Sequence, residues 1–289
     1  MKTLLIGNIS SYSAVRIKEE FEKRGLLLDM VSSHDVVFQV ENSTTRFLKN
    51  TGEDLHSYDV YIFRGMGKRI HELSVVARYL KSHGKTIVED VLTNRAMYID
   101  KFTPTMIDSE IPTLNYTLLF APQPEILERV EYPIIVKGLD SSMGRKVNLV
   151  HNREELDASI EKFKYPIMLQ QYVPIRCDYR VMVIDGEPLG AVVRYNKEGD
   201  FLTIRAGGKP EAVELPQEAL DVAVRATEVA GLTVAGVDLL EHEGVYYRLE
   251  VNMSPQFKVF EHKTEVNVAE KIVDAVVKQH NQERNQKVS

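Results

Sequence analysis

The sequence is poor in cysteine, since Cys177 is the only one among its 289 residues. A disulfide within the chain is therefore excluded, and this usage is typical of proteins in a reducing compartment. Long apolar runs are also missing, because no stretch approaches the ~18 residues that a membrane-spanning helix needs. The apolar run at residues 3–7 is too short for a secretory signal and fits a first strand better. We therefore expect a cytoplasmic protein without a membrane partner.

A surplus of positive charge is lacking as well. The chain has 36 lysine and arginine residues against 42 aspartate and glutamate residues, a formal net charge of −6. This balance provides no basic footprint for nucleic acid and no polybasic membrane patch, although it remains compatible with one local basic cleft. With 44% hydrophobic and 27% charged residues, the composition is that of an ordinary globular protein with a sizeable core. We expect no nucleic acid partner.

The first part of the chain alternates between strand and helix patterns. Short apolar runs predict strands, and longer stretches with helical spacing that end at Gly25 and Gly84 predict helices. The predicted strands are 3–7, 26–31, 58–65 and 85–90, and the predicted helices are 14–25 and 71–84. Strands separated by helices indicate a doubly wound parallel sheet, which we assign to a domain at residues 1–95.

The rest of the chain has a different character, α+β with antiparallel hairpins. Two hairpins are expected at 180–195, turning at Asp185-Gly186, and at 235–252, turning near Gly244. Further strands are expected at both ends of 132–150 and at 165–173, and helices at 97–110, 152–163, 217–232 and 267–280. Asn152 is suited to cap the helix that follows it. The polar tail 281–289 is expected to be frayed.

Three oxygen-bearing side chains are expected to converge on the second of these hairpins. Glu250 and Asn252 lie two residues apart and so share one face of their strand, and a turn near Gly244 brings Asp238 about level with them. Oxygen ligands of this kind suit Mg²⁺ shared with nucleotide phosphates. The alternative is a solvated sheet face, where acidic residues are common. The apolar neighbours favour the metal site, because unpaired carboxylates are costly to bury.

If Mg²⁺ binds there, other groups should hold the phosphates. Lys137 ends a predicted strand before a loop with serine and glycine, and Lys146 and Arg145 add positive charge beyond it. Each lysine or arginine taken singly, Lys101 included, is more often a surface residue. Taken together, Lys101, Lys137, Arg194 and Arg205 would form a basic cleft for a triphosphate.

Four segments carry a resemblance to a known family: "IIVKGLDSSMGRKV" (134–147), "LQQYVPIRCDYRVMVIDG" (169–186), "AGVDLL" (235–240) and "LEVNMSPQF" (249–257). In this order they resemble the ATP-grasp superfamily, and within it the RimK-type group of carboxylate–amine (alpha-L-glutamate) ligases. The resemblance covers about residues 97–280. It implies a pre-ATP-grasp domain followed by a two-lobed ATP-grasp fold, with a central lobe at 96–174 and a C-terminal lobe at 175–289.

The resemblance also implies roles for individual residues. Asp238, Glu250 and Asn252 would hold two Mg²⁺ ions, for which Mn²⁺ could substitute, against the phosphates of ATP. Lys101 and Lys137 would contact the phosphates, and Ser142 and Gly144 would belong to a flexible lid over them. The adenine hinge would be formed by Gln170, Gln171, Tyr172 and Val173. Asp178 would lie near the ribose, and Arg180 follows it in the family's Asp-x-Arg pattern. Arg194 would face the transferred phosphate and the carboxylate substrate, and Arg205 is the nearest match to a family arginine on the acceptor side.

Three positions depart from the group's pattern. Lys146 stands where the lid usually has a second glycine, the "LTIRAGG" segment (202–208) is one residue shorter than usual, and Gln256 follows Pro255 where glycine is common. The last two lie near the acceptor side, so they bear on substrate identity more than on ATP chemistry. A further loop, "RGMGKR" (64–69), follows a strand of the first domain and is either an acceptor-side loop or a basic turn facing solvent.

The function implied is ATP-dependent formation of an amide or peptide bond through an acyl phosphate. An amino acid such as glutamate would be added to a protein, peptide or small-molecule acceptor, so the partners are ATP, an amino acid and a carboxylate or amine acceptor, with a homo-oligomer left open. One alternative keeps the chemistry but uses an amino-carrier protein, a coenzyme or a dipeptide. Another is a non-catalytic nucleotide-binding module, which the complete oxygen triad disfavours. Cys177 has no role in this chemistry.

Overall fold

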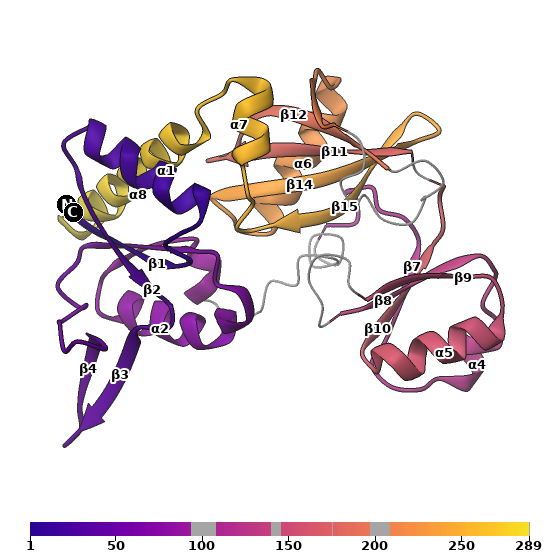
Figure 1. Ribbon diagram of the computed structural model, residues 1–289, viewed down its shortest axis with the longest axis horizontal. Helices are drawn as coiled ribbons and strands as arrows, with labels where there is room; N and C mark the ends of the chain where they lie inside the picture. The colour runs from indigo at the N-terminus through magenta and orange to yellow at the C-terminus, as the bar shows by residue number, and fades with distance from the viewer. Residues whose placement is uncertain (94–107, 140–145, 175, 197–208, 289) are drawn as a thin grey trace.

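A computed structural model describes residues 1–93, 108–139, 146–174, 176–196 and 209–288. The predicted helix at 97–110 therefore lies almost wholly outside the described residues. Three sheets follow one another along the chain, with a small hairpin projecting from the first (Figure 1). Among the described residues, no helix is long and apolar enough to cross a membrane.

The first sheet is parallel and doubly wound, as predicted. Its strand order is β2-β1-β5-β6, formed by Leu27–Ser32, Lys2–Gly7, Val60–Arg64 and Thr86–Val88. Alternate residues of these strands face opposite layers. Leu5 and Ile62 pack with helix α1 (Tyr12–Lys23), whereas Leu4 and Phe63 pack with helix α2 (Ile70–Ser82) on the other face.

A two-stranded hairpin interrupts this unit, and the sequence analysis did not foresee it. Strands β3 (Val36–Glu41) and β4 (Thr44–Lys49) pair antiparallel and project away from the body of the molecule (Figure 1). The turn has positive φ at Asn42 and Ser43, as a two-residue hairpin turn requires. The hairpin's first strand, VVFQVE, is largely exposed although it is rich in Val and Phe, a strand signal that the sequence analysis did not use.

The second sheet is antiparallel and has the order β7-β10-β8-β9. Its strands are Tyr116–Leu119, Ile167–Gln171, Ile134–Gly138 and Val147–Val150. Helix α5 (Arg153–Phe163) covers one face together with the short helix α4 (Pro124–Leu127), and Asn152 caps α5 as predicted, its side chain accepting from the backbone of Glu155 at 3.0 Å. In Figure 1 both helices lie on the side away from the third sheet.

The third sheet is antiparallel, with the order β13-β12-β11-β14-β15. Its strands are Glu211–Val213, Glu187–Tyr195, Cys177–Ile184, Val234–His242 and Val245–Asn252. Both predicted hairpins are confirmed, with positive φ at Asp185 and Gly186 in one turn and at Glu243 and Gly244 in the other. Helix α6 (Gln217–Val229) packs on one face, and helix α7 (Lys258–Thr264) packs near one end of the other.

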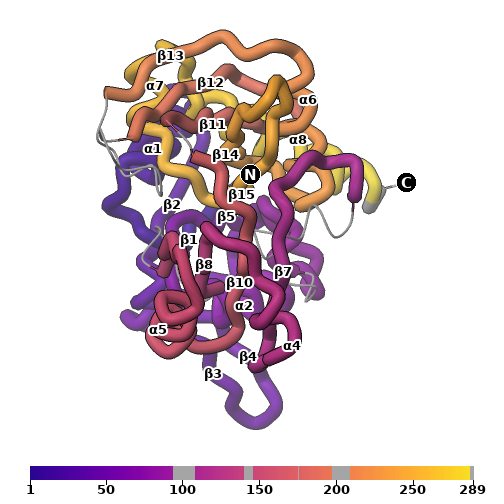
Figure 2. The backbone as a smooth tube through the Cα atoms, turned by 90° about the vertical axis from the view of Figure 1, so that its right-hand side faces the viewer, coloured from indigo at the N-terminus to yellow at the C-terminus, as the bar shows by residue number. Residues whose placement is uncertain are grey.

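The last helix, α8 (Val268–Val288), returns to the first sheet. Ile272, Val273 and Val276 of α8 share a core with Leu5 and with α1. Figure 2 shows α8 beside the first unit, and in Figure 1 the helix lies next to α1. The expected fraying of 281–289 is wrong as far as Val288, because Glu283 accepts a hydrogen bond of 3.0 Å from Lys81 of α2 and the helix continues past it. The domain boundaries at 95 and 174 stay a prediction.

Candidate active site

Six of the predicted site residues project from one face of the third sheet. Asp178 pairs with Arg194 across β11 and β12, Arg180 pairs with Asp238 across β11 and β14, and Asp238 pairs with Glu250 across β14 and β15. Asn252 pairs with Gly236, two residues from Asp238. Direct partners in an antiparallel pair, and residues two apart on one strand, share a face. The prediction that Asp238 lies level with Glu250 on the neighbouring strand is thus confirmed.

Two arginines hold the two buried aspartates of this row. The guanidinium of Arg180 donates to both carboxylate oxygens of Asp238, each at 2.7 Å. Arg194 donates from Nε to Asp178 at 2.6 Å and forms a second, shorter contact with the same carboxylate. Nη2 of Arg194 also lies 3.0 Å from Asp238, so one guanidinium bridges both acids. Asp178 and Asp238 are only 4% and 6% exposed, which makes this pairing necessary.

The balance between burial and the arginines differs for the two carboxyl groups, so their pKa values shift in opposite directions. Burial raises the pKa of Asp178 to about 6, because it outweighs the lowering effect of Arg194 while the charge of Asp238 adds to the rise. Burial would also raise the pKa of Asp238, but Arg180 and Arg194 together outweigh it and lower that pKa below its usual value. Asp238 is therefore the group held ionised, as a metal ligand must be.

The oxygen triad fits a magnesium ion by its chemistry. Asp238, Glu250 and Asn252 supply oxygen atoms from one sheet face, and the amide nitrogen of Asn252 donates to the carbonyl of Gly236 at 3.3 Å. Because the amide nitrogen is used in this hydrogen bond, the side-chain oxygen of Asn252 is the atom that could bind a metal ion. Over the described residues, no group of three or more histidine, cysteine, aspartate and glutamate side chains could hold a metal by itself. An ion here would need the amide oxygen and phosphate oxygens as further ligands, which is usual for Mg²⁺.

The second sheet presents other predicted residues on its face opposite α5. Val136 and Leu169 pack on α5, so Lys137 and Gln170, one position along each strand, project to the other face. The predicted hinge follows at the end of β10. There Gln171 donates its backbone N–H to the Asn115 carbonyl at 2.8 Å, and Val173 packs with Leu240 of the third sheet.

Lys146 does not join this face through its ammonium group. Its Nζ donates to the carbonyl oxygen of Phe163 at 3.1 Å, at the end of α5, while its own carbonyl accepts from Gly138. The contribution of Lys146 to a phosphate cleft stays a prediction. Four predicted residues lie outside the described residues: Lys101, Ser142, Gly144 and Arg205. The neighbouring Arg145 lies there as well.

Sequence reasoning missed the groups that fix the chain just after Asn252. Arg64, at the end of β5 and 2% exposed, donates to the Pro255 carbonyl at 2.9 Å. The neighbouring Gly65 donates its backbone N–H to the Ser254 hydroxyl at 2.9 Å. Gly236 is required on the other side, because a Cβ there would lie 2.7 Å from the Pro255 Cβ. An arginine inside the apolar strand "VYIFR" was the one signal that could have indicated such a contact.

The fold defined by these three sheets is that of the ATP-grasp ligases. The structure of the ATP-grasp ligase PsnB complexed with minimal precursor superposes with a TM-score of 0.74 at 19% identity, covering 96% of this chain and 98% of that one. The same ligase complexed with minimal precursor, Mg and ADP superposes with a TM-score of 0.70 at 18% identity, covering 96% and 98%.

Sequence comparison identifies the family. A model described as the RimK-like ATP-grasp domain matches residues 105–276. A probable alpha-L-glutamate ligase of Aliivibrio fischeri (strain MJ11) is 30% identical over 287 residues, with 95% of this chain and 94% of the relative covered. Probable alpha-L-glutamate ligase 1 of Shewanella frigidimarina (strain NCIMB 400) is 29% identical over 283 residues, covering 94% and 93%. The chain belongs to the RimK-like ATP-grasp family, and it is a ligase of the class that forms carbon–nitrogen bonds.

Proposed function

We propose that this ligase adds an amino acid such as glutamate to a carboxylate-bearing protein, peptide or small-molecule acceptor at the expense of ATP. The names of the full-length relatives support glutamate. The observation that carries the proposal is the direct pairing of Asp238 with Glu250, with Asn252 on the same face. A non-catalytic nucleotide-binding module would not need this set of oxygen ligands beside a bridging arginine.

The metal and nucleotide would be held by residues already described. Asp238, Glu250 and Asn252 would bind two Mg²⁺ ions, with Lys137 on the phosphates and Gln170 to Val173 along the adenine. Lys101, Ser142, Gly144 and Arg205 would complete the cleft from the segments outside the described residues. When bound, Mg²⁺ supplies neutralisation of the phosphate charge and a fixed in-line geometry.

The proposed reaction has two steps. In the first step, a carboxylate oxygen of the acceptor attacks the γ-phosphorus of ATP. The bond between that phosphorus and the β,γ-bridging oxygen breaks, ADP departs, and the acceptor becomes an acyl phosphate. The amine then attacks the acyl carbon, the tetrahedral species expels inorganic phosphate, and the amine proton passes to solvent. Arg194, which bridges Asp178 and Asp238, would supply positive charge to the transferred phosphate and to the acyl oxygens.

A phosphate-release screen tests this function. ATP, Mg²⁺ and single amino acids are supplied with and without peptides that end in a free carboxylate. We expect release that requires both an amino acid and an acceptor, and Asp238→Asn and Glu250→Gln should each lower it at least 100-fold with the fold retained by circular dichroism.

The matched control is Asp157→Asn on the exposed side of α5, where Asp157 pairs with Arg153, and it should keep wild-type release. Phosphate release that Asp238→Asn leaves unchanged would refute the assigned site. Binding of ATP without release under any mixture would favour the nucleotide-binding module instead. Release with a carrier protein, coenzyme or dipeptide alone would favour the alternative ligase.

A further inference from the structure

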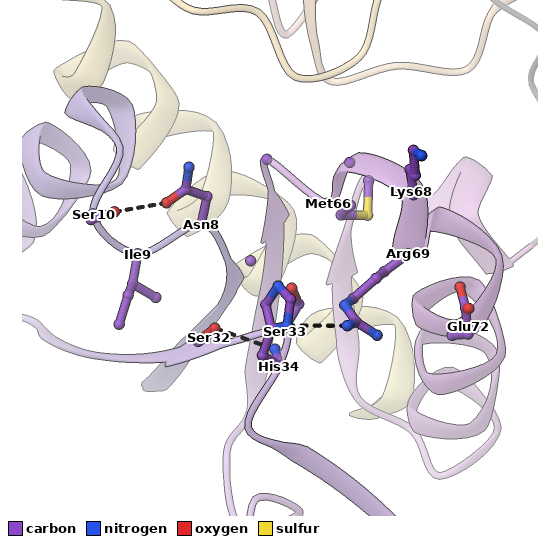
Figure 3. A pocket seen from close by; sticks show the side chains of 13 residues that line it. Asn8, Ile9, Ser10, Ser32, Ser33, His34, Met66, Lys68, Arg69 and Glu72 are labelled. Atoms are coloured by element: carbon purple, nitrogen blue, oxygen red, sulfur yellow. Dashed lines mark hydrogen bonds between the residues drawn. The ribbon is translucent and has the colours of Figure 1, made fainter. Parts of the chain in front are cut away.

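A pocket of about 680 Å³ lies in the first unit, away from the row of aspartates and arginines. It is formed where three parallel strands end: β1 at Gly7, β2 at Ser32 and β5 just before Gly65. Figure 3 shows the side chains that line it. The volume is in the range of small-molecule sites and exceeds what a single carboxylate group needs.

The position of this pocket follows from the strand order. From β1 the chain passes through α1 to β2 on one side, and β5 then lies on the other side of β1. The two crossover helices α1 and α2 accordingly cover opposite faces of the sheet. In open α/β sheets, the crevice outside the carboxyl ends of strands at such a reversal is the preferred ligand site. Gly7 allows the close approach there, because a Cβ would lie 1.6 Å from the carbonyl oxygen of Arg64.

The lining of the pocket favours an anionic ligand. Arg69 and Lys68 carry positive charge, and Glu72 is the one acidic side chain among the described residues that line it. A guanidinium can only donate, so the contact of 3.1 Å between Arg69 Nη2 and Nδ1 of His34 requires that this nitrogen accept. The two side chains thus lie against each other in the lining of the pocket (Figure 3). Because the protein as a whole has a net charge of −6, a locally cationic pocket would concentrate anionic ligands at this one place.

The pocket is joined to the oxygen triad by a short chain of contacts. Gly65 lines the pocket and donates its backbone N–H to the hydroxyl of Ser254 at 2.9 Å. Ser254 is two residues beyond Asn252, at the end of β15. Asn8, also in the lining, donates its backbone N–H to Arg64, which in turn holds the carbonyl of Pro255. A ligand anchored at Arg69 therefore borders the loop that immediately follows the proposed metal ligands.

We propose that this pocket binds a non-reacting carboxylate of an acidic substrate of the ligase, either a free acidic amino acid or the acidic end of a peptide. The inference rests on the proposed function for the identity of the reaction, but the binding step itself needs no nucleotide. Arg69 and Lys68 hold the carboxylate, His34 contacts and supports Arg69, and the rest of the substrate extends past Gly65 toward Asn252. The loop 64–69 is then a substrate loop and not a basic turn facing solvent.

Calorimetry with the full chain tests the proposal without turnover. The probes are L-glutamate, the tripeptide Ala-Glu-Glu, and as a neutral comparison Ala-Gln-Gln amide. We expect the wild type to bind at least one acidic probe and not the neutral one, with Arg69→Gln and Lys68→Gln each weakening the acidic probe at least tenfold. Preference for L-glutamate would identify a free amino acid as the ligand, and preference for Ala-Glu-Glu would identify a peptide end. The control is Arg78→Gln, at an exposed position further along α2. This variant should bind the acidic probes with an affinity within twofold of the wild type.

The same titrations with ADP and Mg²⁺ separate the two proposals. Arg69→Gln should bind ADP–Mg²⁺ as the wild type does, which also shows that the variant is folded, whereas Asp238→Asn should lose that binding and keep the acidic probe. Equal affinity of wild type and Arg69→Gln for the acidic probes, or no binding of either acidic probe by the wild type, would overturn the pocket proposal alone. Failure of the wild type to bind ADP–Mg²⁺ would instead overturn the proposed function.

Discussion

Arg64 donates a hydrogen bond of 2.9 Å to the carbonyl oxygen of Pro255, although the two residues are 191 positions apart in the chain. The guanidinium is 2% exposed, and its Nε and Nη1 have no hydrogen-bond partner among the described atoms. Burial lowers its pKa to about 10, partly offset by the charge of Glu89. One buried cation thus ties the first sheet to the loop behind the proposed metal site.

Replacing this arginine should cost stability and loosen that loop. Arg64→Met leaves the Pro255 carbonyl without its donor and removes the positive charge that offsets Glu89, so we expect the free energy of unfolding to fall by about 1–3 kcal/mol. Urea denaturation measures it. Arg78→Met, on the exposed side of α2, should change it by less than ~0.5 kcal/mol. Equal effects of both substitutions would show that the Pro255 contact contributes nothing.

Glu89 should leave a signature in the pH dependence of stability. It accepts hydrogen bonds of 2.9 Å from the backbone of Thr233 and of Val234, and burial raises its pKa from 4.5 to about 7. Between these values the folded protein binds a proton that the unfolded chain does not, so this contribution to stability is present below about pH 4.5 and is lost as the pH rises through about 7.

The difference between wild type and Glu89→Gln isolates that contribution from the other titrating groups. We expect the stability of wild type relative to Glu89→Gln to decline steadily from pH 4.5 to 7, by urea denaturation at each pH. Glu161→Gln, at an exposed position on α5, serves as the matched control and should give a flat difference. A flat difference for Glu89→Gln as well would contradict a raised pKa.

Arg180 should set the acidic limit of activity. Asp238 must be ionised to act as a ligand, and its pKa is held low by Arg180 and Arg194 against the effect of burial. Arg180→Gln removes one of these charges and should raise that pKa, so the acidic limb of phosphate release moves to higher pH by about 1 unit. The pH profile of kcat/KM measures the shift. Arg153→Gln, which breaks an exposed pair on α5, should leave the profile in place.

Gly236 should not tolerate a side chain. An alanine Cβ would meet the Pro255 Cβ at 2.7 Å, and Gly236 pairs directly with Asn252. Gly236→Ala should lower the free energy of unfolding by about 1–3 kcal/mol and reduce phosphate release, because the loop and the strand end must move. The double variant Gly236→Ala/Pro255→Gly removes the clash and should recover part of both losses, which a cause elsewhere in the sheet would not allow.

The elements that sequence predicts well are those whose apolar periodicity coincides with real burial. Local patterns predicted the parallel direction of the strands in the first sheet, the turn at Asp185-Gly186 and the alignment of Asp238 with Glu250. The hairpin β3–β4 was missed although its first strand, VVFQVE, is rich in Val and Phe, because that run was not analysed as a strand and the strand itself is mostly exposed. The Arg64–Pro255 bond and the bridging position of Arg194 depend on contacts between distant segments, which no local pattern records.

The contact of α8 with Leu5 and α1 has a consequence for how the chain folds on the ribosome. The first strand is synthesised early, but one face of its sheet is covered partly by α1 and partly by α8, which is synthesised much later. Until that helix emerges, aliphatic side chains of β1 and β5 stay accessible to water and to other nascent proteins. The amino-terminal unit must therefore wait, partly assembled, until α8 has left the ribosome before it can reach full stability.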